Sequence, residues 1–250
     1  MANDKPGADV ANFLKASGDD IVRVYLHGKD NKKCVDEIIH NSKCTEIFDA
    51  HHLQDANHVE DIKKLNADFI ITVYWAHLLH PSVFRAARDT INFHPAFLPI
   101  NRGWYPHVHS IIDGSKLGVT LHRIDEGADT GPIWAQKEVE LHPYDSAKII
   151  YEKLQNEIVA LFANNWSKIK SGALEPFNQD ESHANYHAKK EINELDALRI
   201  DENIKVKDLI NILRARSFGN LGFAYYFDQG QKVYLNLRLS KNKNFEADCL

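Results

Sequence analysis

The chain has 250 residues, of which 44% are hydrophobic and 26% are charged. This composition is ordinary for a globular protein that buries its own core. The formal net charge of -5 differs from the basic balance of proteins that grip nucleic acid, so we expect no nucleic-acid partner. No apolar run approaches the roughly 20 residues that span a bilayer, and the N-terminus has no signal-peptide core. We therefore expect a cytoplasmic protein that binds no membrane.

The cysteines and histidines do not form a recognisable metal or disulfide pattern. The irregularly spaced cysteines are Cys34, Cys44 and Cys249. Because they include no CxxC pair, a disulfide framework and a thiolate zinc site are both disfavoured. Neither His51-His52 nor His107 with His109 has a Cys or carboxylate at metal-ligand spacing, and 14 histidines produce such pairs by chance. We predict free thiols and no metal.

The first two thirds of the chain alternate between helical and strand patterns. The predicted elements, in chain order, are helix 8–16, strand 21–26, helix 33–40, strand 45–48, helix 59–65, strand 68–73, helix 81–88 and strand 90–93. The run 68–73 is almost wholly apolar, which is typical of a strand buried on both faces. This alternation predicts an α/β fold, a Rossmann-like parallel sheet with helices on both faces.

The pattern changes in the last part of the chain. Residues 117–123 and 133–141 alternate apolar and polar residues, as half-exposed strands do. Asp145 or Ser146 can cap a long helix that follows, and its apolar positions keep the helical period as far as Trp166. We then predict a polar stretch, a helix over 206–216 and a hairpin of strands 223–227 and 232–237. The predicted regions are a main domain over 1–170, a linker over 171–202 and a small helix–hairpin region over 203–250.

Three polar residues near predicted strand ends could carry chemistry. Asn92 and His94 are two apart, so on an extended strand they point to the same side. Ligands of open parallel sheets bind at the carboxyl ends of strands. Asp129 lies between Gly127 and Gly131, which let the backbone turn tightly. Each residue alone has a structural reading, His94 as a packed side chain and Asp129 as a turn former. Together, an amide, an imidazole and a carboxylate form a set suited to acyl transfer.

Longer segments around these residues resemble the folate-dependent formyltransferase family. That family's signature is an Asn, a His two residues later and an Asp in a D-x-G loop. The segments are Asn92–Pro99, Asn101–Gly103, Gly118–His122 and Asp129–Ile133. The resemblance covers about Ile21 to Trp166 and implies that the main domain is a formyltransferase catalytic domain. It also implies that Asn92, His94 and Asp129 are catalytic and that 10-formyltetrahydrofolate is the co-substrate.

Within the family, residues 101–106 and 110–114 resemble the sugar N-formyltransferase branch. This implies a nucleotide-linked amino sugar as the acceptor, with dTDP-4-amino-4,6-dideoxyglucose as the best match, and a role in O-antigen biosynthesis. It also implies a homodimer, which we expect to form through residues from about 203 to 239. The residues expected to bind the folate are Trp75, His77, Leu78 and Asp125. Those expected to bind the sugar nucleotide are Asn101, Arg102, Gly103, Trp104 and Tyr105, with Arg102 supplying charge for a diphosphate.

The sequence departs from the family at its start. The family fold begins with a strand in the middle of its sheet, whereas this sequence begins at the loop after that strand. We therefore expect the first strand to be missing, which strips hydrogen bonds from its neighbours and opens the core. Two alternatives stay open. One is a formyltransferase that acts on another amine. The other is a catalytically inactive, truncated nucleotide-sugar or folate-binding module.

Overall fold

The computed structural model describes residues 1–28 and 33–241 and confirms the α/β fold. Its central sheet has the strand order β3-β4-β6-β7. These strands are β3 (Phe69–Val73), β4 (Asp89–His94), β6 (Gly118–His122) and β7 (Ile133–Glu138). β3 and β4 are parallel, as the first part of the sequence predicts, whereas β4 with β6 and β6 with β7 are antiparallel. The sheet is therefore parallel on one side only.

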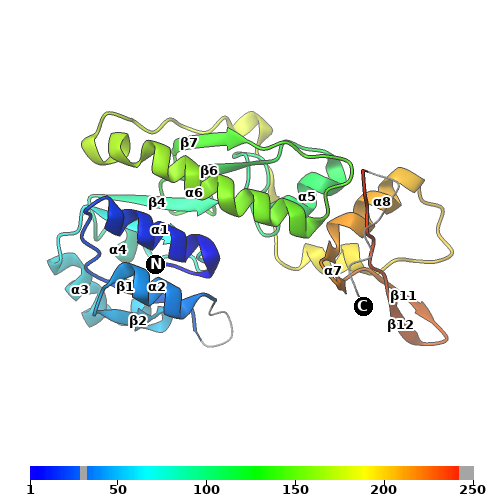
Figure 1. The fold of residues 1–250 in the computed structure, drawn as a ribbon, viewed down its shortest axis with the longest axis horizontal. Helices are drawn as coiled ribbons and strands as arrows, with labels where there is room; N and C mark the ends of the chain where they lie inside the picture. Colours follow the sequence, from blue (N-terminus) through cyan, green and yellow to red (C-terminus); the bar gives the residue numbers. More distant parts are fainter. Residues whose placement is uncertain (29–32, 242–250) are drawn as a thin grey trace.

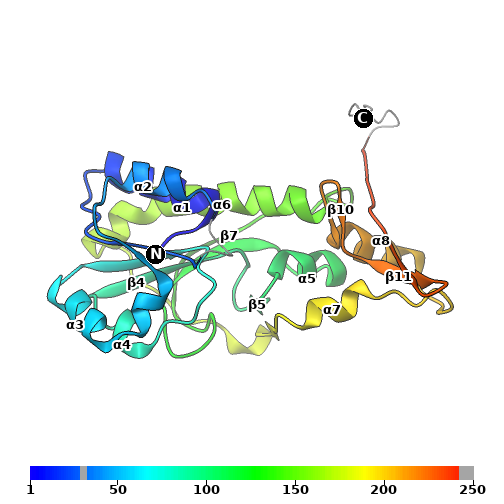
Figure 2. The same ribbon diagram turned by 90° about the horizontal axis from the view of Figure 1, so that it is seen from below.

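Helices cover both faces of this sheet. Figure 2 shows α1 (Asp4–Ala16) and α6 (Ala147–Ser171) above it, with α3 (Ala56–Lys64) and the short α4 (Pro81–Phe84) below. α6 is the predicted long helix, and it begins directly after Ser146. One stripe of α6 is fully buried: Ile150, Leu154, Ile158 and Phe162. Burying each such side chain contributes about 1.5–3 kcal/mol, so this stripe fastens α6 to the sheet.

Strand β6 differs from its prediction as a half-exposed strand. All five of its residues are buried. The reason is that α6 packs against the strand while the segment 95–99 binds it as well. Thr120 Oγ1 donates to the Ala96 carbonyl over 2.7 Å and accepts from the Leu98 amide over 3.2 Å. β7 emerges into solvent at Lys137 and Glu138, so its exposure rises along the strand and does not alternate from residue to residue as predicted.

A second, smaller sheet pairs β1 (Val24–Leu26) in parallel with β2 (Ile47–Asp49). Met1–Asn3 lies between β1 and β3, at the position where the first strand of the fold is expected. The Ala2 amide donates to the Tyr25 carbonyl over 3.0 Å, and the Val73 amide donates to the Met1 carbonyl over 2.9 Å. These residues link β1 to β3, and a cavity of about 370 Å³ lies beside them between the two strands.

Further helices and a short strand complete the described part of the main domain. They are α2 (Val35–Ser42), η2 (Ala50–Gln54), β5 (Arg102–Gly103) and α5 (Pro106–Asp113). Cys34 and Cys44 are free thiols, as predicted. Cys249 and the rest of residues 242–250 lie outside the described residues. In the part of the chain that the structure describes, no helix has both the length and the apolar character needed to cross a bilayer.

The stretch predicted to be a linker packs on the main domain. It contains η3 (Glu181–His183), β8 (Tyr186–His187) and α7 (Glu191–Asp196). β8 pairs in parallel with β5. Before η3, Phe177 forms an isolated bridge with Ile133 at the start of β7. This stretch is therefore part of the folded body of the protein.

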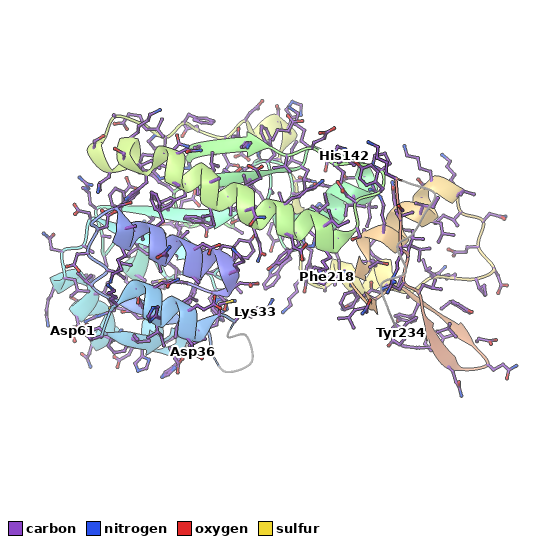
Figure 3. All side chains as sticks on the ribbon, viewed as in Figure 1. Lys33, Asp36, Asp61, His142, Phe218 and Tyr234 are labelled. Atoms are coloured by element: carbon purple, nitrogen blue, oxygen red, sulfur yellow. The ribbon has the colours of Figure 1, made fainter. Side chains whose placement is uncertain are left out.

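The C-terminal part stands apart from the sheet in Figure 1. It consists of α8 (Val206–Ala215), the short pair β9 (Ser217–Phe218) and β10 (Leu221–Gly222), and the hairpin of β11 (Tyr225–Asp228) and β12 (Gln231–Tyr234). α8 packs on α5, and the Arg214 guanidinium donates to the His142 carbonyl over 2.8 Å. Figure 3 shows Tyr234 on the hairpin, away from the main domain.

The hairpin register decides which aromatic side chains share a face. In the structure Tyr225 pairs with Tyr234, and Tyr226 pairs with Val233. Because directly opposed residues share a face, Tyr234 lies with Tyr225 and Phe227. The ring centroid of Tyr225 lies 5.7 Å from that of Tyr234 and 5.6 Å from that of Phe227. These three rings form one aromatic face of the hairpin.

Candidate active site

The three residues expected to be catalytic come together beside the end of β4. His94 Nδ1 lies 3.5 Å from Asp129 Oδ1, and Asn92 Nδ2 donates to the same oxygen over 3.4 Å. β4 supplies Asn92 and His94, and the loop between β6 and β7 supplies Asp129. The φ angle of Asp129 is 58°, a left-handed conformation that costs a non-glycine residue about 1–3 kcal/mol. The surrounding contacts must therefore hold this residue in place.

A fourth side chain, His122, completes the cluster. It lies opposite Asn92 in the antiparallel register, with Nε2 2.9 Å from Asn92 Nδ2 and 3.4 Å from Asp129 Oδ1. His122 Nδ1 donates to the Arg123 carbonyl over 2.6 Å, so Nε2 of the neutral ring accepts from Asn92. Thr72 Oγ1 donates to Asn92 Oδ1 over 2.6 Å. These two partners fix the Asn92 amide in one orientation.

The protonation of His94 follows from its partners. His94 Nε2 donates to the Asn101 carbonyl over 3.2 Å, because a carbonyl can only accept. In the neutral ring this leaves Nδ1 without a proton, facing Asp129. Burial lowers the pKa of His94 below its ordinary value of 6.5, although the charge of Asp129 acts in the other direction. The ring is therefore neutral at pH 7 and able to accept a proton.

Asp129 has the opposite electrostatic character. Burial raises its pKa, but the neighbouring His94 and His122 rings and the Gly103 amide outweigh burial and hold the pKa well below its usual range. The Gly103 amide donates to Asp129 Oδ2 over 2.9 Å. Asp129 is thus ionised beside the neutral His94 ring. The carboxylate is placed to stabilise the positive charge that His94 gains on protonation.

A cavity of about 340 Å³ opens beside this cluster, and Asn92, His94 and Asp129 all line it. The loop after β3 and the loop after β5 form other parts of its wall. Six of the expected ligand-binding residues line it: Trp75, His77, Leu78, Gly103, Trp104 and Tyr105. Of these residues, Leu78 is largely exposed, at 82%. The structure therefore places the three expected catalytic residues and most expected binding residues around one cavity.

Two buried polar atoms in this cavity wall have no hydrogen-bond partner within the described residues. They are the hydroxyl of Tyr74 and Nε1 of Trp75. A buried polar group without a partner costs about 1–3 kcal/mol. Acceptor groups of a bound ligand would satisfy both donors.

Two expected substrate-binding residues lie outside the cavity lining. Asn101 is completely buried, and its amide donates to Ser110 Oγ over 2.9 Å. Arg102 forms a two-pronged ion pair with Glu181, with Nη2–Oε1 at 2.6 Å and Nη1–Oε2 at 3.0 Å. Gln179 accepts from its other donors. The expectation that Arg102 supplies charge to a diphosphate does not fit this geometry, because its guanidinium is paired within the chain.

Two further residues shape the loops around the site. Asp125, expected to bind folate, also lies outside the lining; it accepts from the Gly127 amide over 3.0 Å and from Thr130 Oγ1 over 2.6 Å. It thereby folds the loop that carries Asp129. Gly103 has a φ angle of 87°, and a Cβ there would lie 2.4 Å from the His187 carbonyl. Only glycine fits where β5 meets β8.

Sequence reasoning missed several residues of the site, above all His122, Thr72 and Gln179. His122 belongs to a segment that carries the family resemblance, but only the pairing of β4 with β6 shows that it faces Asn92. Gln179 lies in a stretch without periodicity, and no local pattern marks it. Contacts between distant parts of the chain are needed to find such residues.

One cluster has the spacing of a metal site. The possible ligand atoms of His109, His187 and Glu191 all lie within 4.8 Å of one another. However, the two imidazole rings stack face to face, with centroids 3.5 Å apart and planes 5° from parallel. Ring nitrogens bind a metal in the ring plane, so parallel planes do not converge on one ion. Both nitrogens of His187 are also engaged, by Glu191 and by Asn101. This geometry does not suit a cation.

Comparison with known proteins adds to this geometry. Residues 6–164 match the family Formyl transferase, and residues 191–241 match the N-formyltransferase dimerization C-terminal domain. Over 158 residues the chain is 35% identical to the dTDP-4-amino-4,6-dideoxyglucose formyltransferase of Mycobacterium tuberculosis strain ATCC 25618 / H37Rv. That match covers 63% of this chain and 67% of the relative.

Two solved structures are similar to the whole chain or most of it. A sugar N-formyltransferase from Shewanella sp. FDAARGOS_354 superposes with a TM-score of 0.84 at 24% identity, covering 97% of each chain. A formyltransferase from Anoxybacillus kamchatkensis, solved with UDP-4,6-dideoxy-4-formamido-L-AltNAc and tetrahydrofolate, has a TM-score of 0.54 at 29% identity. It covers 69% of this chain and 88% of its own.

Proposed function

Because the chain belongs to the formyl transferase family, whose match spans residues 6–164, we propose that it formylates the amine of a dTDP-linked amino sugar, dTDP-4-amino-4,6-dideoxyglucose. It is a folate-dependent sugar N-formyltransferase with 10-formyltetrahydrofolate as its co-substrate. The observation that carries the proposal is the contact of Asn92, His94 and His122 with one oxygen of Asp129, at the wall of a cavity.

The cavity suits a folate on two observations. Its wall combines aromatic and apolar side chains, as small-molecule sites usually do. The unpaired Tyr74 hydroxyl and Trp75 Nε1 would meet the acceptor atoms of a polar heterocycle. The folate supplies the formyl group, and we assign Trp75, His77 and Leu78 to holding it. Asp125 acts through the loop that it folds.

Asn92 is the residue that we assign to the developing oxyanion. When the sugar amine attacks the formyl carbon, a C–N bond forms and the formyl oxygen gains negative charge. The short contact of Asn92 Nδ2 goes to His122, whereas its contact to Asp129 is 3.4 Å long. The second N–H is therefore only weakly engaged, and it can donate to an oxyanion that lies in its path while the amide keeps its orientation. A preorganised donor of this kind is worth about 3–4 kcal/mol in comparable sites.

His94 is the base that we assign to the attacking amine. Its Nδ1 carries no proton in the neutral ring, and Asp129 stabilises the imidazolium that forms. The protonated His94 then returns the proton to the nitrogen of the folate as the bond between that nitrogen and the formyl carbon breaks. The products are a sugar formamide and tetrahydrofolate. Asp129 thus orients His94 and balances its charge.

The acceptor site that we propose lies at Gly103, Trp104 and Tyr105. Trp104 offers an aromatic face, and the ammonium of Lys189 lies 4.6 Å from its ring centroid. Lys189 is exposed and could supply the charge for a diphosphate that Arg102 does not. Asn101 and Arg102 do not line the cavity, and they hold this loop through their buried contacts within the chain.

We also propose that the enzyme is a homodimer joined through residues from about 203 to 239. The match of residues 191–241 to a dimerization domain supports this, as does the exposed aromatic face of the hairpin. Two-fold pairing would cover that face isologously. Cytoplasmic localisation and a role in O-antigen biosynthesis stay predictions.

A panel of acceptors tests the proposed function. The purified enzyme is mixed with 10-formyltetrahydrofolate and, in separate reactions, with dTDP-4-amino-4,6-dideoxyglucose, glycinamide ribonucleotide and methionyl-tRNA. Tetrahydrofolate release and the mass of the product are measured. The proposal expects the highest kcat/KM for the dTDP sugar. Preference for either other amine favours the alternative acceptor, and no transfer to any amine favours the inactive binding module.

A further inference from the structure

The stretch 177–187 lies between the two matched regions of the chain, 6–164 and 191–241, and it packs against the catalytic cluster. Phe177 exchanges two backbone hydrogen bonds with Ile133, of 2.7 Å and 2.9 Å. Asn185 Oδ1 accepts from the Asn101 amide over 2.6 Å, and β8 pairs with β5. The stretch is therefore fastened both to the start of β7 and to the loop that follows β4.

Within this stretch, Gln179 uses every hydrogen-bonding position of its amide. Its Nε2 donates to the carbonyl of Asp129 over 2.8 Å and to that of Gly131 over 2.7 Å. Its Oε1 accepts from Arg102 Nη2 over 2.7 Å and from Nε over 3.2 Å. Carbonyls only accept and a guanidinium only donates, so these partners fix the amide in one orientation.

The contacts of Gln179 hold the backbone of the catalytic carboxylate. Asp129 has a left-handed φ of 58°, which a free loop would relax. The Gly103 amide holds its side chain at Oδ2, and Gln179 holds its main-chain carbonyl. Gly103 directly follows Arg102, which binds the same glutamine. One amide thereby connects the two loops that fix Asp129.

We propose that Gln179 is a positioning residue for Asp129, and that the stretch 177–187 is part of the catalytic site. The inference rests on the proposed formyl transfer, since Asp129 acts through His94 in that reaction. Gln179 does not line the cavity, so it acts through Asp129 and not on the substrate. Displacing a catalytic group by a fraction of an ångström to 1 Å lowers the rate without weakening binding.

Two substitutions at Gln179 and one beside it test the proposal. Gln179→Glu keeps an acceptor for Arg102 but loses both donors, and Gln179→Met loses donors and acceptor without adding charge. The control, Asn178→Asp, makes the same amide-to-carboxylate change at the exposed neighbouring side chain. We expect both Gln179 variants to lower kcat by at least about tenfold, because each loses the two hydrogen bonds to the loop of Asp129. We expect KM for both substrates to stay within about twofold, and the control to match the wild type.

The pH dependence separates positioning from a general loss of structure. The charge of Asp129 raises the pKa of His94, so a displaced Asp129 lets that pKa fall. The acid limb of the kcat profile should therefore move to lower pH in Gln179→Met. An unchanged kcat in both variants, an equal loss in Asn178→Asp or an unmoved acid limb overturns the proposal. If the wild type transfers no formyl group, the proposed function fails together with this inference; an active wild type with unaffected Gln179 variants contradicts only the role of Gln179.

Discussion

Two regions of the molecule, the cluster beside β4 and the C-terminal hairpin, use their side chains in opposite ways. Beside the end of β4, the polar groups of Asn92, His94 and Asp129 are paired with one another and with the backbone. On the C-terminal hairpin, Phe227 and Tyr234 are 56% and 60% exposed. Paired polar groups make a site that one protomer completes, whereas uncovered aromatic rings make a surface that a partner covers. Catalysis and assembly should therefore separate by mutation.

The largest effect on turnover is expected at the cluster beside β4. We predict that His94→Ala lowers kcat by at least about a hundredfold, the usual contribution of a positioned acid–base group. The substitution removes the base and leaves the hairpin untouched, so the oligomer mass should not change. Steady-state kinetics and light scattering measure the two quantities. A well-folded His94→Ala variant with nearly full turnover would show that another group takes the proton.

A smaller loss should follow from His122→Phe, which keeps an aromatic ring but removes the acceptor for Asn92. The Asn92 amide then loses one of the two bonds that orient it. We expect kcat to fall by about tenfold, as one hydrogen bond worth about 1.4 kcal/mol implies. His51→Phe at an exposed histidine is the matched control. Equal activity in both variants would mean that Thr72 alone orients the amide.

Features that depend on neighbouring residues could be predicted from the sequence, whereas features that depend on distant residues could not. Periodicity and strand ends were enough to predict α6 and the pair Asn92 and His94, because both depend on neighbouring residues. The packing of the stretch 171–202 and the ion pair of Arg102 with Glu181 were not predictable in this way. They depend on residues far apart in the chain, and no local pattern shows which distant segment a polar side chain will contact.

The value of kcat should depend only moderately on pH near neutrality. In the proposed mechanism turnover needs neutral His94, whose pKa burial holds below 6.5. Activity should be level above about pH 7 and fall as the pH drops through the pKa of His94, because protonation removes the base. The kcat profile between pH 5 and 8 measures this. A rate that rises on acidification would require His94 to act as a cation.

The smallest effect on turnover is expected at the C-terminal hairpin. We predict that Phe227→Asp combined with Tyr234→Asp converts the proposed dimer to a monomer near 28.6 kDa, because each charge would be buried in the proposed interface. Turnover per protomer should stay within about twofold, since no residue of the hairpin lines the cavity. Ile149→Asp, at an exposed position on α6, is the control. A dimer that survives the double substitution would place the interface elsewhere.

The central claim is that the cluster around Asp129 transfers a formyl group to an amino sugar. Rapid-quench single turnover with 10-formyltetrahydrofolate and dTDP-4-amino-4,6-dideoxyglucose tests it most directly, because it isolates chemistry from product release. The wild type should form the sugar formamide, and a folded Asp129→Ala variant should do so at least about a hundredfold more slowly. A folded Asp129→Ala variant that reacts at nearly the wild-type rate would contradict the claim.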